Sequence, residues 1–121
     1  MEREQFERLV QDALEGLPDE LKRYIDNVDV VVQEFPTSAQ VRAGGVRLRW
    51  HILGLYEGIP RTARTSSYNM VLPDRITIFQ KPIEAICRTE EEIVRQVRKT
   101  VVHEVAHHFG ISDERLRELG G

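Results

Sequence analysis

Residues 89–113 decide the fold, and they read TEEEIVRQVRKTVVHEVAHHFGISD. The stretch opens with Thr89 and three acids, which is typical of a helix N-terminus, and Glu92 stands in the position of a capping box. Apolar residues then recur at three- and four-residue steps until Gly110, a residue type that commonly ends helices. The pattern predicts one long helix, with three of the chain's four histidines near its C-terminal end.

Two of these histidines have the spacing of metal ligands. His103 and His107 are four residues apart, so they differ by about 40° around the helix and about 6 Å along it, which suits two corners of a tetrahedral zinc site. Glu104 lies roughly 100° from His103, within reach of a water on the metal but poorly placed as a third ligand. The order HEVAH therefore follows the HExxH logic, in which the acid activates a zinc-bound water for hydrolysis. An ordinary exposed glutamate is the alternative for Glu104.

A catalytic zinc needs a third protein ligand, and Asp113 is the first candidate. Gly110 can adopt the left-handed conformation and turn the chain back, which would swing the Asp113 carboxylate towards the metal. Two alternatives stay open. Asp113 also fits the first turn of a short helix capped by Ser112, where the helix dipole favours an acid without any metal. His51 is another candidate for the third corner, although a single histidine near a strand is usually structural.

The run HEVAHHFGISD resembles the H-E-x-x-H-x-x-G-x-x-H/D signature of the metzincin metallopeptidases, with Asp113 in the place of the third ligand. Residues 53–116 as a whole resemble the small bacterial zincin-like metallopeptidases. The resemblance implies a minimal zincin fold, zinc on His103, His107 and Asp113, and Glu104 as the general acid and base. The larger metzincins place a methionine turn after the third ligand, whereas both methionines of this chain lie upstream of the helix.

Other parts of a peptidase site are less marked in the sequence. Tyr56, Tyr68 and Arg75 are candidate oxyanion stabilisers, because a phenol or guanidinium beside a zinc site can bind the charge of a tetrahedral intermediate. Their spacing does not single them out. His108 lies on a different face of the helix from the paired histidines and is predicted to pack or to support the site.

The rest of the chain predicts a small α+β domain that covers residues 1–121, with a short mixed sheet, the long active-site helix and flanking helices. Residues 37–46 are less regular, and a glycine pair within them should turn the chain. The expected elements are a helix that ends near Gly16, a helix from Asp19, strands over residues 28–35, 53–56 and 75–80, and a short helix after Gly110.

The composition of the chain indicates its expected partners and cellular location. The 121 residues carry a net charge of −3, which gives no electrostatic footprint for nucleic acid. A single cysteine, Cys87, excludes a disulfide within the chain, sits in an apolar run that favours a core thiol over a reactive one, and favours a cytoplasmic location. No secretory leader or membrane-spanning run is visible. The expected partner is a peptide or protein substrate, and the sequence does not indicate an oligomeric state.

Two other functions fit parts of the pattern. The H-x₃-H spacing also resembles small metal-dependent RNA hydrolases that process ribosomal RNA, but those have a third histidine where this chain has Asp113, and they lack the acid that Glu104 provides. A non-catalytic protein-binding module could instead keep zinc only to stabilise its C-terminal helix. A closed fourth coordination position would favour the binding module, and an open one would favour the hydrolase.

Overall fold

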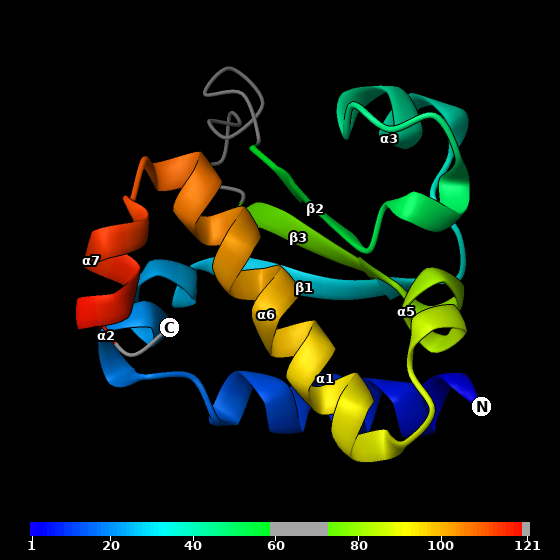
Figure 1. The fold of residues 1–121 in the computed structure, drawn as a ribbon, viewed down its shortest axis with the longest axis horizontal. Helices are drawn as coiled ribbons and strands as arrows, with labels where there is room; N and C mark the ends of the chain where they lie inside the picture. Colours follow the sequence, from blue (N-terminus) through cyan, green and yellow to red (C-terminus); the bar gives the residue numbers. More distant parts are fainter. Residues whose placement is uncertain (59–72, 120–121) are drawn as a thin grey trace, which may run out of the picture.

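A computed structural model describes residues 1–58 and 73–119 of the chain. Within these ranges three strands form one mixed sheet with the order β1-β3-β2 (Figure 1). The central strand β3 (Asp74–Phe79) pairs in parallel with β1 (Val28–Gln33) and antiparallel with β2 (Gly54–Glu57). The predicted α+β class and mixed sheet are confirmed. The first strand ends two residues earlier than predicted, the second lies one residue later, and the third lies one residue earlier.

The long helix α6 (Glu90–Phe109) crosses one face of this sheet. It begins at the predicted cap, because the Thr89 hydroxyl accepts a hydrogen bond of 3.1 Å from the backbone amide of Glu92. The reciprocal half of the predicted capping box is not formed, since the Glu92 carboxylate accepts from the amide of Arg88 instead of Thr89. It ends at Gly110, whose φ of 68° lies in the left-handed region that favours glycine. An apolar stripe at helical spacing buries this face against the sheet and the N-terminal helix, and it comprises Ile93, Val97, Val101 and Val105.

The N-terminal helix α1 (Arg3–Glu15) packs against α6 and completes the main core together with Ile76 and Ile78 of β3. Phe6 and Ala13 of α1 are fully buried. The Arg98 guanidinium of α6 donates to the Ala13 carbonyl at 3.1 Å, and this contact holds the C-terminal part of α1 against α6. The short helix α2 (Asp19–Ile25) follows, in the place that the acids after Pro18 predict.

Three short elements in the described ranges, two α-helices and one 3₁₀ turn, have no counterpart among the predicted elements. The helix α3 (Ser38–Ala43) begins at a capping box of Thr37 and Gln40, and the 3₁₀ turn η1 (Arg49–His51) follows it. The helix α5 (Gln80–Ile86) starts directly after β3, with Pro82 in its first turn, where proline is tolerated. On the sheet face opposite the main core, a smaller apolar cluster joins these segments to the sheet through Ile52, Leu55, Phe79, Val41 and Val46.

The last helix, α7 (Asp113–Glu118), is separated from α6 by three residues. The Ser112 hydroxyl accepts from the Arg115 amide at 3.1 Å, so Ser112 is the N-cap that the sequence predicts. None of the helices in the described ranges combines the length and the apolar character needed to cross a membrane.

Candidate active site

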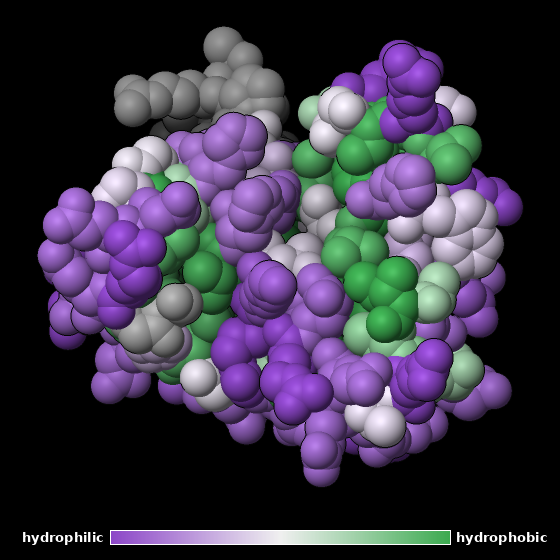
Figure 2. Space-filling view, viewed as in Figure 1, coloured by the Kyte–Doolittle hydropathy of each residue, from purple (hydrophilic) through white to green (hydrophobic). Residues whose placement is uncertain are grey.

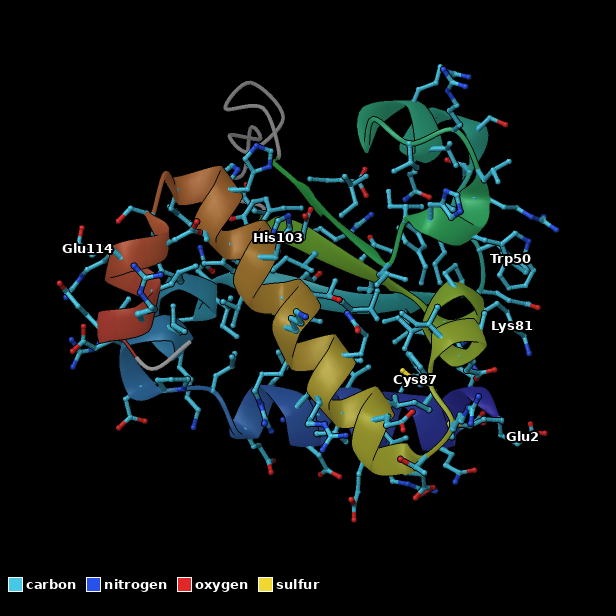
Figure 3. The ribbon with its side chains drawn as sticks, in the orientation of Figure 1. Glu2, Trp50, Lys81, Cys87, His103 and Glu114 are labelled. Carbon is cyan, nitrogen blue, oxygen red and sulfur yellow. The ribbon has the colours of Figure 1, made fainter. Side chains whose placement is uncertain are left out.

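The paired histidines belong to the C-terminal half of α6. Figure 3 labels His103 on this part of the helix, and His107 follows about one turn later. The ring centroids of His103 and His107 are 6.5 Å apart, with 39° between the ring planes. Both side chains are exposed. The i, i+4 spacing therefore places both imidazoles on one open face of the helix, where small side-chain rotations could bring both ring nitrogens to one ion.

Glu104 is held by the sheet. Its carboxylate oxygen Oε1 accepts a hydrogen bond of 2.8 Å from the backbone amide of Tyr56 in β2. The direction of this amide follows from the pairing of β2 with β3. The Leu53 carbonyl accepts from the amide of Phe79 at 3.0 Å. In an antiparallel pair every second residue turns its backbone groups to the partner strand, so those of Leu55 and Glu57 also face β3. The amide of Tyr56 then points to the other edge of β2. The Glu104 side chain reaches this edge from α6 and accepts from a donor that no strand in the described ranges uses.

A polar cluster fixes the C-terminal end of α6 beside the site. The phenol of Tyr56 donates to Asp74 Oδ2 at 2.7 Å, and its ring stacks on the His108 ring with centroids 3.9 Å apart. His108 Nε2 lies 3.8 Å from the same Asp74 oxygen, and the Phe109 ring packs edge-on against both rings. His108 thus supports the site by packing, in agreement with its expected role. The Tyr56 phenol, a candidate oxyanion stabiliser, is engaged by Asp74 in this structure.

A cavity of about 320 Å³ opens on the other side of His103 and Glu104. It lies between α6 and the segment that leads from α3 through η1 into β2. Around it the surface is polar over α6 and more apolar on the side of η1 and α5 (Figure 2). The lining residues are Gly44, Val46, His51, Ile52, Leu53, Gly54, Gln96, Lys99, Thr100, His103 and Glu104.

Gly54 sets the distance between β2 and α6 at the floor of this cavity. A Cβ atom at position 54 would lie 2.7 Å from Thr100 Cγ2 and 3.2 Å from the carbonyl oxygen of Thr77. Only glycine therefore lets the strand approach the helix this closely. The close approach is what brings the Tyr56 amide within reach of Glu104 two residues further along the strand.

Of the other candidate residues, one lies at the cavity, one lies on the far face of the sheet, and one is outside the described residues. His51 lines the same cavity as His103 and Glu104. Arg75 is exposed and precedes Ile76, whose side chain points to the α6 face of the sheet, so strand alternation turns Arg75 to the opposite face, away from the paired histidines. Tyr68 lies outside the described residues. Gln96 and Lys99 also line the cavity, although they were not among the predicted site residues. They lie seven and four residues before His103, and this helical spacing is the sequence signal for them.

A three-ligand metal group is not formed by the His, Cys, Asp and Glu side chains of residues 1–58 and 73–119. Asp113 is exposed and is the first residue of α7, directly after the N-cap Ser112. This position fits the alternative interpretation, in which the helix dipole favours an acid without any metal. Two imidazoles on one exposed helix face are donors that zinc accepts. The residues present therefore suit zinc in chemistry, with two donors already side by side.

Cys87 is separate from this site. Its thiol is half-buried against the main core, and its pKa is raised by that burial and by the nearby charge of Glu92. A raised pKa keeps a thiol protonated and unreactive at neutral pH, which agrees with the expected packing role.

Comparisons with known proteins point to one family. A family model described as zincin-like metallopeptidase matches residues 25–121. Among solved structures, a conserved hypothetical protein from Thermo thermophilus has a similar fold, with a TM-score of 0.54 and 22% sequence identity over 90% of this chain and 94% of that chain. No curated protein sequence matches the chain significantly.

Proposed function

The chain belongs to the zincin-like metallopeptidase family, and from this premise we propose that it is a zinc-dependent hydrolase of peptide bonds. The observation that carries the proposal is the placement of Glu104. Its carboxylate lines the same cavity as His103 and is held there by the Tyr56 amide at 2.8 Å. An acid fixed beside a histidine pair, at the mouth of a cavity, is the arrangement that hydrolysis of a bound peptide requires.

His103, His107 and Asp113 would hold the zinc. Asp113 is separated from the end of α6 by Gly110, Ile111 and Ser112 alone, and the proposal requires this short connection to rearrange so that the carboxylate joins the two histidines. Zinc, when bound, supplies a Lewis acid that lowers the pKa of water and polarises a carbonyl group.

Glu104 would move the proton. The Tyr56 amide occupies Oε1, which leaves Oε2 to take a proton from the attacking water and to deliver it to the amine of the leaving peptide. The hydrogen bond limits the rotation of the carboxylate, so the base is positioned before the substrate arrives. We also propose a cytoplasmic location, because a reducing compartment suits a chain with a single cysteine.

Digestion of a peptide library by zinc-loaded protein tests the proposal, with metal content measured on the same sample. The Glu104→Gln variant should keep its zinc and lose about two orders of magnitude or more in the rate of cleavage. Glu91→Gln is the matched control, because Glu91 is an exposed acid in the first turn of the same helix. Cleavage by Glu104→Gln at the rate of the parent protein would remove Glu104 from the mechanism.

A further inference from the structure

The cavity beside Glu104 has a charge pattern of its own. Its α6 wall carries Lys99, whose side chain is exposed, and its opposite wall carries His51. Glu104 is the one carboxylate among the lining residues, and it already accepts the amide of Tyr56. The part of the cavity away from Glu104 therefore holds a cation and an imidazole without an acid.

Lys99 differs from the two other lysines of the chain. Lys22 lies 4.0 Å from Asp19 and Lys81 lies 3.6 Å from Glu84. Across the described ranges, no carboxylate lies within ion-pair distance of Lys99. The ammonium group is thus available to an anionic ligand.

The remaining lining suits the stem of such a ligand. Val46, Ile52 and Leu53 form an apolar wall, while Gln96 is tied to Thr100 by a hydrogen bond of 3.2 Å. An apolar wall that faces a cation matches a side chain with methylene groups and a terminal carboxylate. Glutamate has this form, and aspartate has a shorter stem.

The distance along α6 places this ligand relative to the reacting bond. Lys99 lies four residues before His103, which is about 6 Å along the helix axis. An extended peptide advances about 3.3 Å per residue. For an extended peptide that runs along α6, Lys99 is therefore level with the residue about two positions from a carbonyl group held at His103.

We propose that this cavity is a specificity subsite that selects a glutamate side chain in the peptide, about two residues from the bond that is cleaved, through an ion pair with Lys99. The proposal rests on the proposed peptidase function for the position of the bond, but the binding preference itself can be measured without cleavage. It assigns the selectivity to the side of the cavity away from the paired histidines.

The test is competitive retention of peptides on the immobilised full chain in the Glu104→Gln background. Randomised octapeptide pools with glutamate at one fixed position compete with matched pools that carry glutamine there, and mass spectrometry gives the retained ratio. For the pools whose fixed position reaches Lys99, an exposed ion pair predicts a ratio of about five in favour of glutamate. Raising the salt to about 0.5 M should bring the ratio close to one, because the contact is exposed to solvent.

Two lysine variants provide the contrast. Lys99→Glu should abolish or reverse the preference, and the milder Lys99→Gln should abolish it. Lys22→Glu makes the same change in net charge at a distant helix and should leave the ratio unchanged. A ratio near one at every fixed position, a preference that survives Lys99→Gln, or a preference that persists at high salt would overturn the subsite.

Cleavage by the protein with Glu104 intact is scored separately. A glutamate preference without cleavage would uphold the subsite and count against the peptidase function. Cleavage without a preference for glutamate would support the peptidase function and overturn the subsite.

Discussion

The backbone amide of Tyr56 donates a hydrogen bond of 2.8 Å to the carboxylate of Glu104, across 48 residues of sequence. The edge strand β2 thereby positions Glu104, the acid of the HExxH run. Because the donor is a main-chain group, substitution of the Tyr56 side chain leaves it in place. Substitutions of Glu104 itself can separate its two roles, because glutamine still accepts this hydrogen bond but cannot act as the base.

We expect Glu104→Gln to preserve stability and Glu104→Ala to reduce it. The glutamine amide oxygen can still accept from Tyr56, whereas alanine removes this acceptor from the partly buried amide, at a loss of about 1 kcal/mol in the free energy of unfolding. Urea unfolding of both variants measures the difference. Equal stability of the two variants would show that the hydrogen bond does not contribute, and cleavage rates should fall in both.

Replacing either paired histidine by alanine should remove the zinc. His103→Ala and His107→Ala each leave one imidazole on the helix face, which is too few donors for tight binding. Metal analysis after dialysis gives the stoichiometry. His51→Ala is the control, since His51 shares the cavity but is expected to lie outside the ligand set. Loss of zinc from His51→Ala would instead support His51 as the third ligand.

Variants of Asp113 decide between its two interpretations. As a ligand, Asp113 predicts that Asp113→Ala weakens zinc affinity by more than the ~10–100-fold typical of a residue behind the ligands, and that Asp113→His restores much of it. As an acid at the start of α7, it predicts unchanged zinc affinity and a stability loss of about 0.3–1 kcal/mol in Asp113→Asn. Zinc titration with a competing chelator distinguishes the two, and full affinity in Asp113→Ala would exclude the ligand role.

The Gly54→Ala substitution adds a methyl group that should push β2 away from α6. The new Cβ would lie 2.7 Å from Thr100 Cγ2, and overpacking of this kind lowers the free energy of unfolding by about 1–3 kcal/mol. Thr100→Ser removes the opposing methyl group, so the double variant should recover part of the loss. Thermal unfolding of the two single variants and the double variant provides the cycle. Strict additivity of the two changes would show that Thr100 is not what limits the approach.

Gly110 should resist substitution for a conformational reason. Its φ is 68°, and a Cβ there would meet no atom within 4 Å, so any penalty comes from the backbone alone. We expect Gly110→Ala to cost about 1–2 kcal/mol in the free energy of unfolding and Gly110→Asn to cost less, because asparagine tolerates the left-handed region better. Chemical denaturation measures both. An alanine variant as stable as the parent would mean that the chain ends α6 in another conformation.

The sequence by itself determined the features that depend on neighbours a few residues apart. Thr89 caps α6 through the amide three residues on, Gly110 ends the helix by its own conformation, and the helical repeat places His103 and His107 on one face. These are local hydrogen bonds, dihedral preferences and periodicity, and each can be read from a short window.

The short helices show where such reading fails. Thr37 and Gln40 form a capping box that a local pattern contains, yet α3 has only six residues, too few to be stable as an isolated helix. It is held by contacts from elsewhere: Val41 packs on the cluster of Ile52, and the Gln40 side chain bonds to Glu57 at 3.2 Å. Its formation depends on residues that are near in space and distant in sequence.

Tertiary structure alone decided how the candidate site is completed. The Tyr56 amide meets Glu104 because β2 lies at an edge of the sheet beside α6, and Gly54 permits the close approach of that strand. The engagement of the Tyr56 phenol by Asp74 and the location of Arg75 on the far face follow from strand pairing and side-chain alternation. Strand pairing brings together residues from separate segments, and their relative positions depend on the packing of the whole core rather than on spacing along the chain.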